Sequence, residues 1–292
     1  MTTDQSPAER VSTVVDGVVV LGALSPSRAG DFMTCPLLYR YRTIDKLPEP
    51  PSPDAVRGTV VHKVLEVLFD LPAAQRTPEQ ARELLVPAWA ELLEVAPELA
   101  EMFASDPGEG PDLATWMTSC RSVLDRYFTL EDPRLLEPAE RELYVETLLE
   151  SRLLLRGFID RVDIAPDGAI RVVDYKTGRS PGEMFEGKAL FQMKFYALVL
   201  WRTRGVLPAM LQLVYLGNGE MVRYVPDEQD LLATERKVEA VWHAIRRAEE
   251  SGDWRPSPSK LCAWCAHQAI CPAYGGTPPP LPVRQPTTAP TG

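Results

Sequence analysis

The stretch that decides the fold is LLLRGFIDRVDIAPDGAIRVVDYK, residues 153–176. Apolar and polar residues alternate on both sides of Pro166-Asp167-Gly168, which is typical of two strands joined by a tight turn. A three-residue hairpin loop with glycine in the left-handed position fits this tripeptide. We therefore predict an antiparallel hairpin that pairs Ile164 with Ile170 and Val162 with Val172.

The predicted register brings two aspartates face to face. Asp160 would lie opposite Asp174, and Lys176 would project from the same face two residues further on. Opposed residues in an antiparallel pair have Cβ atoms about 4.5–5.5 Å apart, so the carboxylates would repel each other without a cation between them. Mg²⁺ or Mn²⁺ suits such oxygen ligands. The alternatives are a surface hairpin whose aspartates pair with Arg161 and Arg171, and the carboxylate pair of a glycosidase.

Further candidates lie outside the hairpin. His62 falls on a predicted helix over residues 56–71, where it is either a metal ligand or a core histidine. Gln192 and Tyr196 are four residues apart on a predicted helix over 186–203, so they share a face. They could contact the lysine, a phosphate or a base, or form an ordinary helix-surface pair. Gly157 before the first aspartate would let a substrate backbone approach.

Four of the five cysteines form a spaced set. Cys262-x2-Cys265-x5-Cys271 lies near the C-terminus, and Cys35 lies far upstream. This clustering predicts a metal site, which can be zinc or a [4Fe–4S] cluster. Cys35 is the natural fourth ligand and His267 is its rival. Cys120 is expected to be a buried core residue.

The composition is that of a soluble globular protein. The chain has 292 residues, 45% of them hydrophobic and 25% charged. No apolar stretch is long enough for a membrane span and no signal peptide is present, so we expect a cytoplasmic location. The net charge of −10 disfavours non-specific affinity for nucleic acid, although a locally basic groove is compatible with it.

The order of predicted elements indicates a mixed α/β fold. We expect an N-terminal extension over 1–22, one domain over 23–274 and a disordered Pro/Thr-rich tail over 275–292. The domain would contain a helical insertion at about 72–138 and a cysteine segment at 258–274. Strands are predicted at 141–149, 153–164, 169–176, 210–216 and 221–225, and further helices at 26–34, 37–42 and 229–251.

Several motifs together resemble a known family. His62, Gly157-x-x-Asp160, Asp174-Tyr-Lys176 and Gln192-x3-Tyr196 resemble the RecB-type branch of the PD-(D/E)xK nuclease superfamily. The four spaced cysteines are similar to its iron–sulfur subgroup, which includes AddB-type nuclease domains and CRISPR-associated single-strand exonucleases. The resemblance runs from about residue 25 to residue 274, and the motifs occur in the family's order.

The resemblance implies a restriction-endonuclease-like core, with a central mixed sheet flanked by helices. It implies that His62, Asp160, Asp174 and the main-chain carbonyl of Tyr175 bind Mg²⁺ or Mn²⁺. Lys176 would be the catalytic lysine, and Gln192 and Tyr196 would help to place the DNA. Finally, it implies that a [4Fe–4S] cluster, with structural zinc as the alternative, is bound by Cys35, Cys262, Cys265 and Cys271.

The expected function is that of a metal-dependent DNA nuclease. We favour exonuclease action on single-stranded or end-containing DNA, in repair or recombination. The alternative is a catalytically silent, cluster-bearing DNA-binding or scaffold protein. The chain lacks the phosphate-binding Gly-x4-Gly-Lys-[Ser/Thr] motif, so any helicase would be a separate partner. In the helical part, Trp89, Trp116 and Tyr127 are candidates for base stacking, although core packing is the role we expect.

Overall fold

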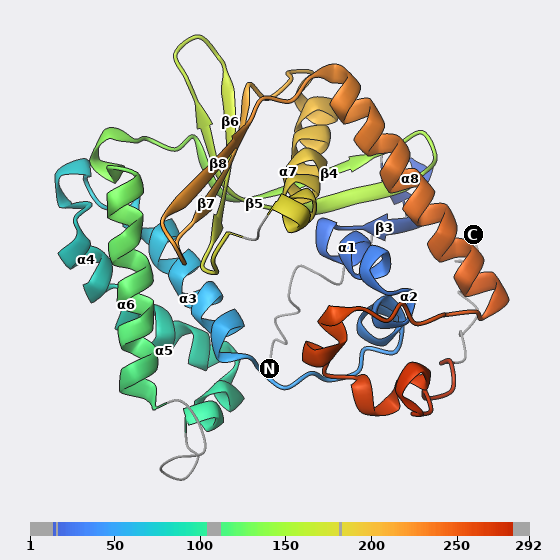
Figure 1. Ribbon diagram of the computed structural model, residues 1–292. Helices are drawn as coiled ribbons and strands as arrows, with labels where there is room; N and C mark the ends of the chain where they lie inside the picture. Colours follow the sequence, from blue (N-terminus) through green and yellow to red (C-terminus); the bar gives the residue numbers. More distant parts are fainter. Residues whose placement is uncertain (1–13, 16, 104–111, 181–182, 283–292) are drawn as a thin grey trace. The chain divides into compact units, whose positions relative to one another are not determined.

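The computed structural model describes residues 14–15, 17–103, 112–180 and 183–282 (Figure 1). The chain divides into two compact units. The first comprises Met1–Pro26 and Pro51–Arg236, and the second comprises Ser27–Pro50 and Lys237–Gly292. Most of the expected N-terminal extension, part of the expected helical insertion and the end of the tail lie outside the described residues. No described helix combines the length and the apolar composition that a bilayer span requires.

The first unit is built on a mixed sheet, as the sequence predicts. Its strands follow the order β3-β5-β6-β7-β8, and β4 pairs with β5. The β3–β5 and β6–β7 pairs are parallel, and the other pairs are antiparallel. The strands are β3 (Gly22–Leu24), β4 (Glu140–Leu148), β5 (Leu153–Ile164), β6 (Ile170–Lys176), β7 (Met210–Tyr215) and β8 (Glu220–Tyr224).

The predicted hairpin register is confirmed from the turn as far as Arg161 and Val173, but the expected pairing of Asp160 with Asp174 is not part of the ladder. Ile164 pairs with Ile170 and Val162 pairs with Val172 across β5 and β6. Gly168 closes the turn with a φ of 86°, which is the left-handed conformation that the three-residue loop requires. The last ladder pair before the candidate site is Arg161 with Val173.

Beyond that pair, the two strands separate. On the edge that faces β6, β5 pairs with β3 at residues 153–155 and with β6 at residues 161–164. Residues 156–160 have no ladder partner on this edge among the described strands, while β4 pairs along the other edge. The sheet therefore opens into a fork at Asp160, and the carboxylate of Asp160 accepts a hydrogen bond from the Tyr175 N–H at 2.7 Å.

Helices cover both faces of β6 in this unit (Figure 1). Val173 and Tyr175 belong to a buried cluster with one group of helices, whereas Asp174, which alternates with them, contacts α7 (Glu183–Arg204). The group comprises α3 (Pro53–Leu68), α4 (Pro78–Glu83), α5 (Leu85–Val95) and α6 (Leu113–Leu130). The predicted helical character of this part of the chain is confirmed.

The aromatic residues of the helical part are core residues. Trp89, Trp116 and Tyr127 are 7%, 3% and 0% exposed and belong to the same buried cluster. Side chains with so little exposed surface cannot stack on a nucleobase. Cys120 is fully buried in this cluster as well, which confirms its expected structural role.

The second unit contains α2 (Pro36–Tyr39), a π-helical turn at Arg40–Ile44, and three short 3₁₀ turns between Lys260 and Tyr274. The helices α1 (Pro26–Thr34) and α8 (Glu228–Ser251) contribute most of their length to it. Tyr39 stacks on Trp254 with ring centroids 6.0 Å apart, and the Tyr41 hydroxyl donates a hydrogen bond to the Ile270 carbonyl at 3.1 Å. These contacts fasten the C-terminal segment to α2 and the π-helical turn within the unit.

Candidate active site

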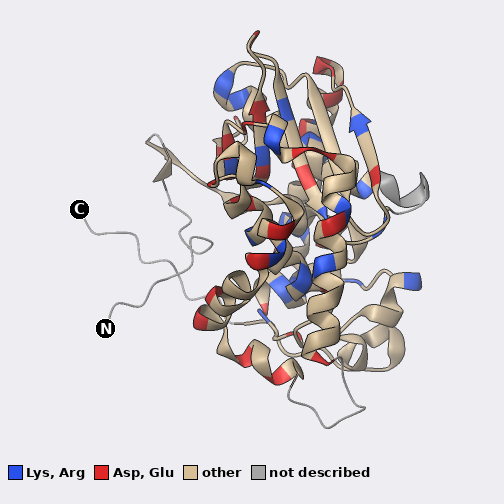
Figure 2. Ribbon diagram, turned by 90° about the vertical axis from the view of Figure 1, so that its left-hand side faces the viewer, with Lys and Arg blue, Asp and Glu red and all other residues tan. Residues whose placement is uncertain are grey.

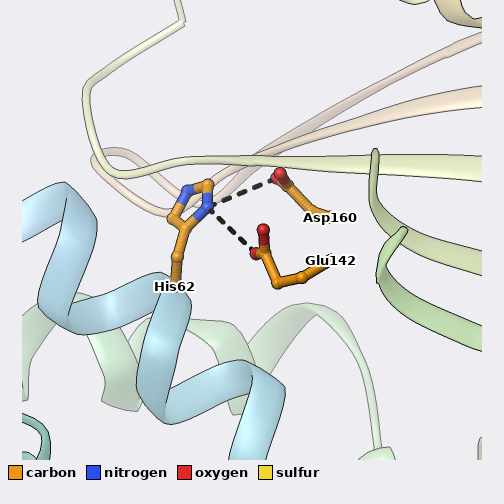
Figure 3. A group of neighbouring side chains, drawn as sticks. All are labelled: His62, Glu142 and Asp160. Atoms are coloured by element: carbon orange, nitrogen blue, oxygen red, sulfur yellow. Dashed lines mark ion pairs between the residues drawn. The ribbon is translucent and has the colours of Figure 1, made fainter. Parts of the chain in front are cut away.

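Three side chains from three elements converge at the fork (Figure 3). His62 comes from α3, Glu142 from β4 and Asp160 from β5. The His62 Nδ1 atom lies 3.6 Å from Asp160 Oδ2 and 4.0 Å from Glu142 Oε1. Among the described residues, this is the one group of three or more His, Cys, Asp or Glu side chains whose ligand atoms all lie within 4.8 Å of one another.

Glu142 is the site residue that the sequence analysis missed. Arg141 pairs with Arg161 and Leu143 pairs with Ile159, so Glu142 lies directly opposite Asp160 in the β4–β5 register. Its φ of 43° is rare for a residue other than glycine, so the backbone is strained at the point where the carboxylate meets the site. A register argument from the turn at residues 150–152 would have found it, just as the Gly168 turn predicted the register of Asp160.

The charges at this point of the sheet repel one another. Burial raises the pKa of Asp160 well above its usual range, and the neighbouring Asp174 carboxylate raises it further. Burial also raises the pKa of Glu142 to about 7, with added repulsion from Glu66 and Asp174. Burial lowers the pKa of His62, so the neutral imidazole is favoured. The two carboxylates supply oxygen donors, and the neutral imidazole supplies a nitrogen donor. Together they form a donor set that fits a divalent metal ion.

The backbone of Tyr175 orients His62. The Nε2 atom of His62 lies 2.9 Å from the Tyr175 carbonyl oxygen. In the tautomer that carries its proton on Nε2, the imidazole donates to this carbonyl and presents the lone pair of Nδ1 to the two carboxylates. Here the Tyr175 carbonyl contacts His62, and its role as a metal ligand stays a prediction.

Asp174 and Lys176 form a second, adjoining cluster with α7. Lys176 Nζ lies 2.7 Å from Asp174 Oδ2 and donates to Gln192 Oε1 at 2.8 Å. The amide of Gln192 donates in turn to Asp174 Oδ1 at 3.0 Å and to the Tyr196 hydroxyl at 3.4 Å. The structure thus brings all four residues together beside Asp160. Asp174 is engaged by the lysine here, so its assignment as a metal ligand stays a prediction as well.

Gly157 has a different neighbour from the one we expected. A Cβ atom at this position would lie 2.7 Å from Cε1 of Tyr196 and 3.5 Å from Cδ of Pro26. The ring of Tyr196 therefore fills the space that we had assigned to a substrate backbone. The glycine is required because it allows α7 to bring Tyr196 and Gln192 up to the fork.

The face of the hairpin opposite Asp160 and Asp174 carries a buried ion pair that stabilises the fork. The guanidinium of Arg161 is 1% exposed and lies 2.8 Å from the Glu131 carboxylate. It also donates to the Tyr175 hydroxyl and contacts Asp163 at 3.1 Å. Arg161 follows Asp160, and Tyr175 lies between Asp174 and Lys176, so these contacts link both arms of the fork.

Two cavities adjoin His62 and differ in charge. One, of about 520 Å³, is lined by Glu66, Glu142 and Lys63 beside α3. The other, of about 430 Å³, is lined by three cations: Lys176, Arg179 and Lys188. Over the ribbon as a whole, acidic and basic residues are interspersed (Figure 2).

The loop that carries Arg179 is held by the β7–β8 turn. The Gly217 N–H donates to the Gly178 carbonyl at 2.9 Å, and the Ser180 N–H donates to Asn218 Oδ1 at 3.1 Å. A Cβ atom at Gly217 would lie 2.2 Å from the carbonyl carbon of Gly178, so only glycine allows this approach. The cationic cavity is therefore lined by a fixed backbone.

The four spaced cysteines gather in the second unit. Cys35, Cys262, Cys265 and Cys271 all line one cavity of about 60 Å³, together with His267. The Ser257 N–H donates to the sulfur of Cys35 at 3.4 Å. The Ser259 N–H donates to the sulfur of Cys262 at 3.3 Å and lowers the pKa of that thiol, as does the Tyr274 side chain.

His267, the alternative fourth ligand, contacts a carboxylate. The Nε2 atom of His267 lies 2.8 Å from Glu49 Oε1, and the His267 side chain is 5% exposed. The predicted approach of Cys35 to the C-terminal cysteines, across most of the sequence, is thus present in the fold. The identity of the group that they bind remains a matter for proposal.

Two phage proteins are similar to this chain over most of its length. Gene 69 protein of Mycobacterium phage D29 is 28% identical over 271 residues, covering 86% of this chain and 96% of the phage protein. Gene 69 protein of Mycobacterium phage L5 is 25% identical over 297 residues, covering 89% of this chain and 100% of the phage protein.

A solved structure shares the fold. The crystal structure of a candidate exonuclease from Eubacterium rectale aligns with a TM-score of 0.52 at 13% identity, covering 84% of this chain and 87% of that chain. A family model of the PD-(D/E)XK nuclease superfamily matches residues 23–272, which contain the hairpin, the fork and the four cysteines. The chain belongs to the PD-(D/E)XK nuclease superfamily.

Proposed function

We propose that the protein is a metal-dependent DNA nuclease that hydrolyses phosphodiester bonds at the fork, with Mg²⁺ or Mn²⁺ as cofactor. The observation that carries this proposal is the convergence of His62, Glu142 and Asp160 beside the Asp174–Lys176 pair. The name of the structural neighbour from Eubacterium rectale favours exonuclease action. Single-stranded or end-containing DNA is the proposed substrate, in repair or recombination, and any helicase would be a separate protein.

The donor atoms define where the metal ion would bind. His62, Glu142 and Asp160 would hold it. Asp174, whose charge raises the pKa of Asp160, is proposed as a further ligand. When bound, a divalent ion polarises the phosphate and lowers the pKa of a water ligand. Because the metal-free carboxylates repel one another, cation binding would also stabilise this part of the sheet.

The residues of the chain itself would position and stabilise the reacting phosphate. Lys176 is held by Asp174 and Gln192, so its ammonium group is already placed to stabilise negative charge that develops on the phosphate. Arg179 and Lys188, in the adjoining cavity, would contact the next phosphate along the strand. Tyr196 supports Gln192 through its hydroxyl.

We further propose that the four cysteines hold a [4Fe–4S] cluster, with structural zinc as the alternative. All four cysteines line one cavity. N–H groups donate to the sulfurs of Cys35 and Cys262, as is common around iron–sulfur clusters.

The test is digestion of end-labelled single-stranded and double-stranded oligonucleotides with Mg²⁺, Mn²⁺ or EDTA. Wild-type protein should cleave only with a divalent metal, and Lys176→Met should lose activity while it keeps its melting temperature. The exposed Lys237 supplies the matched control, Lys237→Met, which should cleave normally. Metal-independent binding of DNA without any cleavage would instead support the silent scaffold.

A further inference from the structure

Two aromatic side chains lie exposed next to the metal-ligand residues. Tyr144 on β4 and Phe158 on β5 are directly paired on neighbouring strands, and their ring centroids lie 5.2 Å apart at an interplanar angle of 57°. They are 42% and 43% exposed. Both belong to the first unit and to the strands that carry Glu142 and Asp160.

The pair occupies the next position along the fork. Glu142 lies opposite Asp160, and Tyr144 lies opposite Phe158 two residues further along each strand, a separation of about 7 Å along the strand. Phe158 lies in the middle of residues 156–160, the part of β5 that has no ladder partner on its other edge among the described strands. The rings are thus adjacent to the reacting phosphate that the proposed function places at Asp160.

The orientation of Tyr144 is fixed by a hydrogen bond. Its hydroxyl donates to Glu146 Oε2 at 2.6 Å, so the ring is held beside Phe158 rather than free to turn. Ordered aromatic faces that remain in contact with water are suited to stacking on nucleobases, and such stacking tolerates any base. In a duplex the bases are stacked inside the helix, so only an unpaired base can reach such a surface.

We propose that Tyr144 and Phe158 form a stacking platform for an unpaired nucleobase of single-stranded DNA, adjacent to the scissile phosphate. The platform selects single strands and frayed ends over intact duplex. This inference rests on the proposed nuclease function, because it assigns the base that belongs to the phosphate at the fork. The competing explanation is a cross-strand pair that only stabilises the sheet.

The experiment measures binding and stability in parallel. Fluorescence anisotropy with a labelled single-stranded oligonucleotide in EDTA compares wild type with Tyr144→Ala, Phe158→Ala and the double variant. Loss of one stacked base should weaken binding about 5- to 140-fold, with a smaller effect on duplex. Leu135→Ala removes exposed apolar surface elsewhere in the first unit, since Leu135 is 83% exposed, and should bind as the wild type does.

A second arm uses wild-type protein and altered DNA, so it does not depend on whether a variant folds. An abasic nucleotide is moved stepwise along the strand. An abasic nucleotide at one position next to the cleaved bond should lower the affinity of wild type for the strand. The same nucleotide should not change the affinity of the double variant. Phe158→Trp, which keeps an aromatic ring at this position, should keep affinity.

Two results separate the inference from the function beneath it. If wild type cleaves single strands but neither the alanine variants nor the abasic scan changes affinity, the platform is refuted and the nuclease stands. If wild type cleaves no DNA with any metal, the nuclease proposal is refuted, whatever the binding results are.

Discussion

Replacement of Gly157 by alanine tests how α7 is placed against the fork. The new Cβ atom would lie 2.7 Å from Cε1 of Tyr196, which is closer than two carbon atoms can approach. The ring is 7% exposed and cannot move without displacing its neighbours. Overpacking of this kind costs about 1–3 kcal/mol, which corresponds to a fall in melting temperature of roughly 2 to 12 °C for a domain of this size.

The same displacement should reach the candidate catalytic lysine. The Tyr196 hydroxyl is 3.4 Å from the amide of Gln192, whose oxygen accepts from Lys176 at 2.8 Å. A misplacement of about 1 Å in such a cluster can slow a reaction by about 100-fold. We therefore expect Gly157→Ala to reduce kcat more than it changes KM, measured with a labelled single strand and excess metal.

Two comparisons make the result decisive. Gly187→Ala, on α7, is the matched control because no heavy atom lies within 4 Å of its added Cβ, and it should be neutral or slightly stabilising. In a Tyr196→Ala background, the cost of Gly157→Ala should disappear. A Gly157→Ala protein that melts and cleaves like wild type would refute the close approach of this ring.

Three further predictions address charge and cofactor. The pKa of Glu142 is about 7 in the folded protein against 4.5 ordinarily, so its contribution to stability falls as pH rises through this window. In EDTA, wild type should therefore lose stability relative to Glu142→Gln as the pH rises between these values. Added Mn²⁺ should restore more stability to wild type than to the variant. Calorimetry measures both effects. Glu131→Gln leaves the buried Arg161 charge with Asp163 as its remaining charged partner, and we expect a loss of about 3 kcal/mol in denaturant unfolding. Cys262→Ser should lower the iron content and visible absorbance of anaerobically purified protein.

The last two of these have a matched control within the chain. Asp125 pairs with Arg82 at an exposed position, with side chains 43% and 40% exposed, so Asp125→Asn should cost only about 0–1 kcal/mol. Cys120 lies in the helical core, so Cys120→Ala should keep its iron although it loses some stability. Zinc instead of iron in colourless protein would contradict the cluster proposal, and equal pH profiles for wild type and Glu142→Gln would contradict the assigned pKa.

The sequence by itself determined the hairpin and its register. Alternating hydrophobicity and a Gly168 that tolerates positive φ permit one pairing that buries Val162 and Val172, both of which are 0% exposed. This local rule placed Asp160 near Asp174. The Lys176 motif and the cysteine spacing were likewise readable, because ligand chemistry demands particular residue types at short separations.

Only the tertiary structure decided which groups complete the site. Glu142 joins Asp160 through a strand that precedes it in the chain, and Tyr196 rather than a substrate fills the space beside Gly157. Such contacts depend on how the strands separate at the fork and on where α3 and α7 pack, and no local pattern encodes these. The physical reason is that alternation fixes the face of a side chain within one strand, whereas the position of a helix against the sheet results from packing over the whole core.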